Sequence, residues 1–97
     1  MQNIYIIRMG NTQLFKIGIS CDPEKRCKQL QTGNPFNLKI MYNFKINEKY
    51  KIKACKIEKT IHDYLRNVKN NYMKNEWFTL TNDEVVKLVK CLINSFS

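Results

Sequence analysis

A few polar side chains of this chain have the chemistry that metal-assisted cleavage of a phosphodiester bond requires. A phenol, an ammonium and a guanidinium come early, as Tyr5, Lys16 and Arg26, and a carboxylate, Glu58, stands four residues before His62. A phenol can act as a base toward water, cations can stabilise charge on a phosphate, and a carboxylate can hold a divalent ion. The types and order of these residues therefore predict a nuclease-like site.

The first twenty residues predict a β-hairpin that places two of these side chains on one face. Strands are expected at 3–9 and 14–20, joined by a short turn. The register that pairs Tyr5 with Gly18 gathers four isoleucines on one face, and a shift of one residue would scatter them over both. Tyr5 and Lys16 then rise from the opposite face, beside a position that has no side chain.

A helix is expected to carry the guanidinium. Asp22 is a typical N-cap, and Pro23 follows at the position where its missing N–H costs nothing. This helix should run to about Thr32 and stop at the Gly-Asn-Pro sequence that follows, with Arg26 near its inward face. The candidate contacts to nucleic-acid phosphates are Lys25, Lys28 and Ser20.

The rest of the chain predicts a third strand and two more helices. Alternation at 36–46 predicts a strand with five residues on one side: Leu38, Ile40, Tyr42, Phe44 and Ile46. Helices are expected at 50–68 and 83–96, the second capped by Thr81 or Asn82, and 77–80 is strand-like. The predicted fold is a single α+β domain, residues 1–97, with a small three-stranded antiparallel sheet flanked by helices.

Glu58 falls inside the apolar stripe of the helix expected at 50–68. An ionised carboxylate at the edge of a core is costly unless a cation or a metal holds it. Two interpretations stay open: a metal ligand, or a boundary glutamate that reaches solvent or pairs with Lys59 or His62. His62, one turn further on, either orients Glu58 or a metal-bound water, or is a buried structural donor. Trp77 and Phe78 are most simply core residues, with base stacking as the alternative.

The composition favours a polyanionic partner. Seventeen basic residues against eight acidic ones give a net charge of +9, which suits a nucleic acid or an anionic membrane, with a solvated lysine surface as the alternative. No apolar run reaches the roughly 18–20 residues of a membrane span, and no signal-peptide pattern is visible, so we expect an intracellular protein of the cytoplasm or nucleus. The four cysteines form no C-x-x-C pair, and reduced, mostly buried thiols are expected.

The ordered set of motifs resembles the GIY-YIG nuclease superfamily. Ile4-Tyr5 and Ile17-Gly18 resemble the two halves of its signature, with Asn3 in place of the signature glycine. The match over about residues 3–80 is similar to the compact meiotically-up-regulated-gene branch, which often stands alone or is fused to viral and phage proteins. In that branch a lysine such as Lys16 commonly replaces the second tyrosine. Further matching pieces are Asp22-Pro23, Arg26, residues 30–35, Glu58, His62 and Glu76-Trp77-Phe78.

This resemblance implies a divalent-metal-dependent DNA endonuclease or nickase, with DNA as partner and no small-molecule cofactor. Tyr5 would be the base, Arg26 and Lys16 would stabilise charge, and Glu58 would bind Mg²⁺ or Mn²⁺, which prefer oxygen ligands. An unperturbed tyrosine has a pKa of about 10, and we expect the two cations to lower it.

The late metal-site asparagine of many GIY-YIG members has no certain match. Asn75 and Asn82 are the candidates in this sequence. This gap favours a catalytically weak or inactive nucleic-acid-binding domain on the same fold. A protein-interaction module whose charge is incidental is the third alternative.

Overall fold

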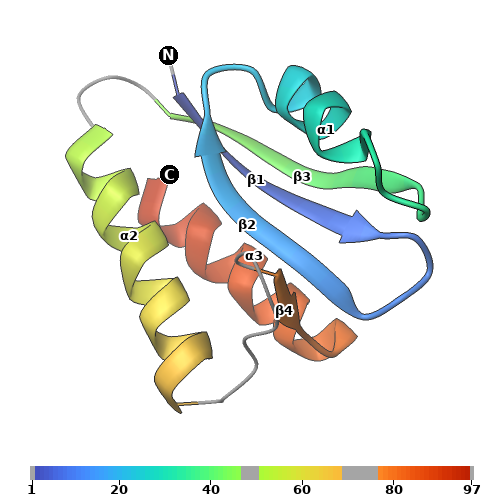
Figure 1. Ribbon diagram of the computed structural model, residues 1–97. Helices are drawn as coiled ribbons and strands as arrows, with labels where there is room; N and C mark the ends of the chain where they lie inside the picture. The colour runs from blue at the N-terminus through green and yellow to red at the C-terminus, as the bar shows by residue number, and fades with distance from the viewer. Residues whose placement is uncertain (1, 47–50, 69–76, 97) are drawn as a thin grey trace.

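The structure is a computed structural model that describes residues 2–46, 51–68 and 77–96. Its elements are, in order, β1 (Gln2–Met9), β2 (Leu14–Ser20), α1 (Pro23–Gln31), β3 (Leu38–Ile46), α2 (Lys51–Asp63), the π-helical segment η2 (Tyr64–Val68), β4 (Trp77–Thr79) and α3 (Asn82–Phe96). In Figure 1, α1 covers one face of the sheet, and α2 and α3 cover the other. The predicted α+β class is confirmed.

The described strands form a four-stranded antiparallel sheet rather than the three-stranded one expected, in the order β3-β1-β2-β4. The additional strand is the strand-like stretch at 77–80. Its residues 77–79 pair with the start of β2, from Leu14↔Thr79 to Lys16↔Trp77. This pairing brings Trp77 beside Lys16, one of the predicted site residues.

The hairpin register follows the isoleucine pattern, as predicted. Tyr5 lies opposite Gly18, and Ile7 lies opposite Lys16. Four isoleucines of the hairpin are fully or partly buried in the core on the α2–α3 face of the sheet: Ile4, Ile6, Ile17 and Ile19. Tyr5 and Ile7 belong to the smaller core on the α1 face. Burial of one face thus fixes which side chains the other face presents.

The third strand begins at Leu38 and does not keep one face, so the expectation of a single apolar side is wrong. Buried and exposed positions alternate along it, but its register with β1 shifts between Ile6 and Ile7. Ile6 pairs with Tyr42 and Ile7 pairs with Ile40, so one residue of β3 is left over between them. Such a bulge changes which face the following side chains occupy. The residues before it, Leu38 and Ile40, pack on the α1 face, and Tyr42, Phe44 and Ile46 pack on the other.

Both predicted helix starts are confirmed by their hydrogen bonds. The Lys25 N–H donates to Asp22 Oδ1 at 3.1 Å, which makes Asp22 the N-cap of α1, and Thr32 is the C-cap. At α3, the Glu84 N–H donates to Thr81 Oγ1 at 3.2 Å, and the Thr81 N–H donates to Glu84 Oε1 at 3.0 Å. This reciprocal pair is a capping box that settles the cap on Thr81.

The helix expected at 50–68 is an α-helix over 51–63 followed by one π-helical turn to residue 68. Its predicted start, Tyr50, lies outside the described residues. No helix in the described part of the chain combines the length and the apolar character needed to cross a bilayer.

The cysteines are free thiols, but most of them are not buried. Cys21, Cys55 and Cys91 are exposed, which corrects the expectation of mostly buried thiols. Cys27 is a half-buried residue of α1, and its Sγ lies 3.8 Å from the carbonyl oxygen of Leu38. Burial raises the pKa of the Cys27 thiol, because desolvation disfavours the thiolate.

Candidate active site

The Tyr5 phenol lies directly over Gly18. A Cβ placed on Gly18 would stand 2.5 Å from the phenol oxygen and 2.7 Å from the ring carbon that carries it. Any side chain at this position would displace the ring, so glycine is needed here for space. The phenol thus reaches across β2 between Lys16 and Ser20, which point to the same face because strand side chains alternate.

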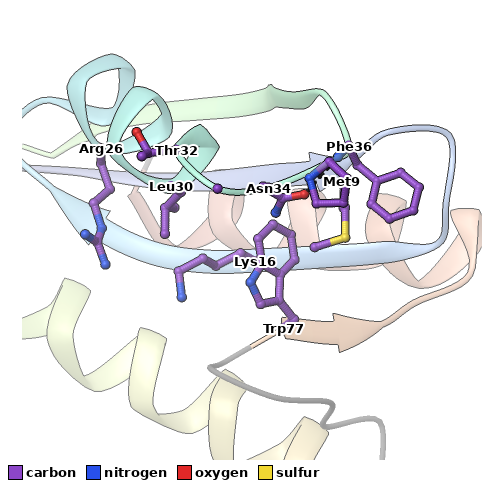
Figure 2. A pocket seen from close by; sticks show the side chains of 10 residues that line it. Met9, Lys16, Arg26, Leu30, Thr32, Asn34, Phe36 and Trp77 are labelled. Atoms are coloured by element: carbon purple, nitrogen blue, oxygen red, sulfur yellow. Dashed lines mark hydrogen bonds between the residues drawn. The ribbon is translucent and has the colours of Figure 1, made fainter.

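Lys16 and Arg26 line one cleft of about 550 Å³ on the α1 face of the sheet. Lys16 comes from β2 and is only 5% exposed, whereas Arg26 is an exposed residue of α1. Figure 2 shows both side chains toward one end of the cleft, with Leu30 between them in this view. A lysine buried in the wall of a cleft concentrates positive potential inside it. The cleft therefore suits an anionic group.

The rest of the cleft is formed by Trp77 of β4, by Met9 and by the loop after α1. The lining residues besides Lys16, Arg26 and Leu30 are Met9, Thr32, Gly33, Asn34, Pro35, Phe36 and Trp77. Trp77 is 9% exposed and packs in the core of the α1 face, so the expectation that it is a core residue is confirmed, and its ring also borders the cleft. Phe78 is fully buried on the opposite face.

Gln31 holds the loop after α1. Its Nε2 donates to the carbonyl oxygens of Asn34, at 3.2 Å, and Phe36, at 2.8 Å. Its Oε1 accepts from the Leu38 N–H at 2.8 Å. Asn34 Oδ1 accepts from the Phe36 N–H at 3.0 Å, and Gly33 takes a φ of +78° that favours glycine. These side-chain hydrogen bonds thus fix the loop that lines the cleft.

The three predicted phosphate contacts surround α1 but do not line the cleft. Lys25 and Lys28 are exposed on α1, and Ser20 is half-buried just before it. Ser20 Oγ accepts from the Asp22 N–H at 3.0 Å, so its hydroxyl hydrogen points elsewhere. Lys25 and Lys28 lie on the same helix as Arg26 and add to its positive charge, and Ser20 ends the strand that precedes this helix.

His62 is turned toward the edge of β2. It is 7% exposed, and its Nε2 donates to the carbonyl oxygen of Ile17 at 2.7 Å. Among the described residues, β4 pairs with β2 only as far as Lys16, so His62 supplies a partner to the next carbonyl along that edge. Its ring also lies 5.2 Å from that of Phe78. These contacts are those of a structural donor, and a catalytic contribution of His62 stays a prediction.

Glu58 is half-buried on α2, one turn before His62. Residues four apart share a helix face, so Glu58 is also directed toward the sheet. In Figure 1, α2 begins near the end of β2 and runs back along it. Glu58 belongs to α2, which packs on the α2–α3 face of the sheet, whereas Lys16 and Arg26 line the cleft on the α1 face. Glu58 is not part of the cleft lining.

Metal binding at Glu58 stays a prediction. In the described parts of the chain, no three His, Cys, Asp or Glu residues gather into a metal-binding group. A dedicated protein cage is not formed by these residues. One carboxylate fits a hard ion such as Mg²⁺ that takes its other oxygens from water and from a phosphate. Of the two candidates for a late asparagine, Asn75 lies outside the described residues, as does Glu76, and Asn82 begins α3.

The sequence did not reveal the aromatic end of the cleft. The Gly33-Asn34-Pro35 sequence signalled a helix stop, and Trp77 signalled a core residue. The available signal was Gln31, a polar residue directly before a glycine loop, whose amide can bind several backbone groups at once. Nothing local places Trp77 next to Lys16, because their pairing joins positions far apart in the chain.

The fold and the site define a small, basic α+β domain with a buried phenol and a cleft lined by two positively charged side chains. The chain belongs to the T5orf172 domain family, whose sequence profile matches residues 2–93. This is a phage-type family of nucleic-acid-related domains, associated with nuclease-like ones. No curated protein and no solved structure matches the chain.

Proposed function

We propose that this domain is a DNA endonuclease or nickase of the GIY-YIG type that depends on Mg²⁺ or Mn²⁺. One observation carries the proposal: the Tyr5 phenol is held over Gly18 on the same face of β2 as Lys16, which lines the cleft with Arg26. A base and two cations around one phosphate are the groups that phosphodiester hydrolysis uses. Membership of the T5orf172 family supports a nucleic-acid-related role.

In this mechanism the scissile phosphate binds between Arg26 and Lys16. The phenolate form of Tyr5 accepts a proton from a water molecule, the water oxygen forms a bond to phosphorus, and the bond from phosphorus to the leaving strand oxygen breaks. The leaving oxygen takes up a proton from solvent. The two cations stabilise the charge that builds up on the phosphate oxygens in the transition state.

Glu58 is the residue that would hold the divalent ion. When bound, such an ion neutralises charge on phosphate and leaving-group oxygens.

Tyr5 is 3% exposed, so its phenol can meet solvent only over a narrow area. This enclosure would let Tyr5 orient a single water molecule in place of contacting bulk solvent.

Long-range attraction would bring DNA to this site. The net charge of +9 attracts the phosphate backbone, and exposed Lys25 and Lys28 lie on the helix that carries Arg26. Contacts of this kind position the backbone without reading the bases. We therefore expect weak sequence selectivity.

A second candidate function is nucleic-acid binding without cleavage. Two observations favour it: the absence of a group of three metal-ligating side chains in the described residues, and the use of His62 Nε2 on a backbone carbonyl. Both observations fit a domain that has a basic cleft and no complete metal site among the described residues.

A plasmid-nicking assay separates the two candidates. Supercoiled DNA is incubated with the protein and Mg²⁺ or Mn²⁺, beside Glu58→Ala and beside a sample with EDTA. The nuclease should relax the plasmid only with metal and with Glu58 intact. A wild-type protein that shifts the plasmid in a gel and leaves it supercoiled with both metals would establish the binding domain.

A further inference from the structure

The cleft beside the Tyr5–Gly18 contact has two chemically different ends. Figure 2 shows Arg26 and Lys16 toward one end, Trp77 and Asn34 in the middle, and Met9 and Phe36 at the other. Guanidinium and ammonium groups bind phosphates, whereas an indole, a phenyl ring and a thioether offer flat or soft apolar surface. A single ligand that spans this cleft would have an anionic end and an apolar, planar end.

The aromatic end is held open by the protein itself. The Gln31 side chain makes three hydrogen bonds to the backbone between Asn34 and Leu38, and these bonds fix the loop that carries Phe36. Phe36 nevertheless stays 48% exposed, while Trp77 is anchored by its place in β4. A ligand therefore meets preformed walls, which reduces the entropy lost on binding.

We propose that this cleft binds one unpaired nucleotide of a DNA strand, with its phosphate at Arg26 and Lys16 and its base against Trp77 and Phe36. The volume, about 550 Å³, lies in the range of about 300–1,000 Å³ typical of small-ligand sites. A base inside a duplex must leave its stack and its partner to enter such a site. Single-stranded, frayed or gapped DNA is therefore the preferred substrate class. This inference rests on the proposed function, because it concerns the same two cations.

Base stacking on aromatic rings tolerates every base, since each base has a flat face. The cleft should therefore select the unpaired state of DNA and show little preference for sequence. Trp77 is the only tryptophan of the chain, so intrinsic tryptophan fluorescence reports on this cleft alone.

The test compares two DNA probes in EDTA, where cleavage does not occur. One is an oligothymidine of about eight nucleotides, a length within the range that one single-strand-binding domain covers, and the other is a blunt, GC-rich duplex. The oligothymidine should quench Trp77 fluorescence and bind about 10-fold more tightly than the duplex at the same salt concentration. Phe36→Ala should weaken oligothymidine binding by about 10-fold, the loss of one stacked base, and leave duplex binding unchanged.

Tyr64→Ala is the matched control, because Tyr64 is similarly exposed, at 47%, and does not line this cleft. It should bind both probes as the wild type does. Equal affinity for the two probes with unchanged fluorescence would overturn the inference, even if the plasmid is nicked. Quenching by the oligothymidine alone would support it even if no nicking occurs. The two proposals therefore fail separately.

Discussion

The Tyr5 phenol fills the space that a side chain on Gly18 would need. A Cβ on Gly18 would stand 2.5 Å from the phenol oxygen. The contact arises because β1 and β2 pair these two residues directly, on the face opposite the buried isoleucines. It fixes the phenol on the same face of β2 as Lys16, which lines the basic cleft. Several measurable properties depend on this arrangement.

Gly18→Ala should destabilise the fold and move Tyr5. Overpacking of a buried contact costs about 1–3 kcal/mol, which thermal unfolding would detect as a lower Tm. Tyr5→Leu should restore part of the lost stability in the double variant, because the shorter side chain frees the space. Gly33→Ala is the control: it has no atom within 4 Å but a φ of +78°, so its cost comes from the backbone and Tyr5→Leu should not restore it. A Gly18→Ala protein with wild-type Tm would contradict the contact.

DNA affinity should fall log-linearly with salt concentration, with a slope of about −0.9 for each phosphate neutralised. Replacing Lys25 and Lys28 together by Gln should reduce the magnitude of that slope by about 2. The same change at Lys87 and Lys90, two basic residues of α3 on the other side of the sheet, serves as the control and should leave it unchanged. Affinity that does not change with salt would count against lysine–phosphate binding.

The Cys27 thiol should react more slowly with iodoacetamide than the exposed thiols of Cys21, Cys55 and Cys91. Burial raises the pKa of Cys27, so its reactive thiolate forms only at higher pH. The protonated thiol contributes to the stability of the fold. This contribution is fully present below the unfolded-state pKa and is lost as the pH rises through the folded-state pKa. Mass spectrometry of alkylated peptides across a pH series measures this order. Equal rates would show that the Cys27 side chain is not shielded by packing between α1 and the sheet.

Glu58→Gln should abolish cleavage and weaken Mg²⁺ binding while Tm stays near that of the wild type. The substitution keeps the shape of the side chain and removes the charge that an ion needs. Asp63→Asn, at an exposed position of the same helix, is the matched control and should change neither property. Calorimetric titration with Mg²⁺ and thermal unfolding together decide the role. A lower Tm with unchanged metal binding would identify Glu58 as a structural ion-pair partner instead.

Local rules were sufficient for the hairpin and the helix ends. The isoleucine parity set the register because only one face of the hairpin has enough apolar residues to enter the larger core. Asp22 and Thr81 were recognisable as caps because capping depends on side chains within three residues. These features place Tyr5, Lys16 and Arg26 without knowledge of the tertiary structure.

Long-range packing decided the rest. The bulge between β1 and β3 lets one strand serve two cores, and the alternation of its own residues cannot reveal that shift. His62 finds its hydrogen-bond partner 45 residues away, at Ile17, on an edge that β4 leaves open. The aromatic end of the cleft likewise depends on β4 joining β2. Such partners follow from tertiary contacts, which no local sequence pattern encodes.

The central claim is that the Tyr5 phenol is the base of a cleavage reaction. Its direct test is single-turnover cleavage by Tyr5→Phe, which removes the hydroxyl and keeps the ring over Gly18. The rate should fall by about 10²–10⁴ with little change in DNA affinity. Lys16→Met should also slow cleavage and move the alkaline rise of the pH–rate profile to higher pH, because the phenolate loses a nearby cation. A Tyr5→Phe protein that cleaves at nearly the wild-type rate would contradict the claim.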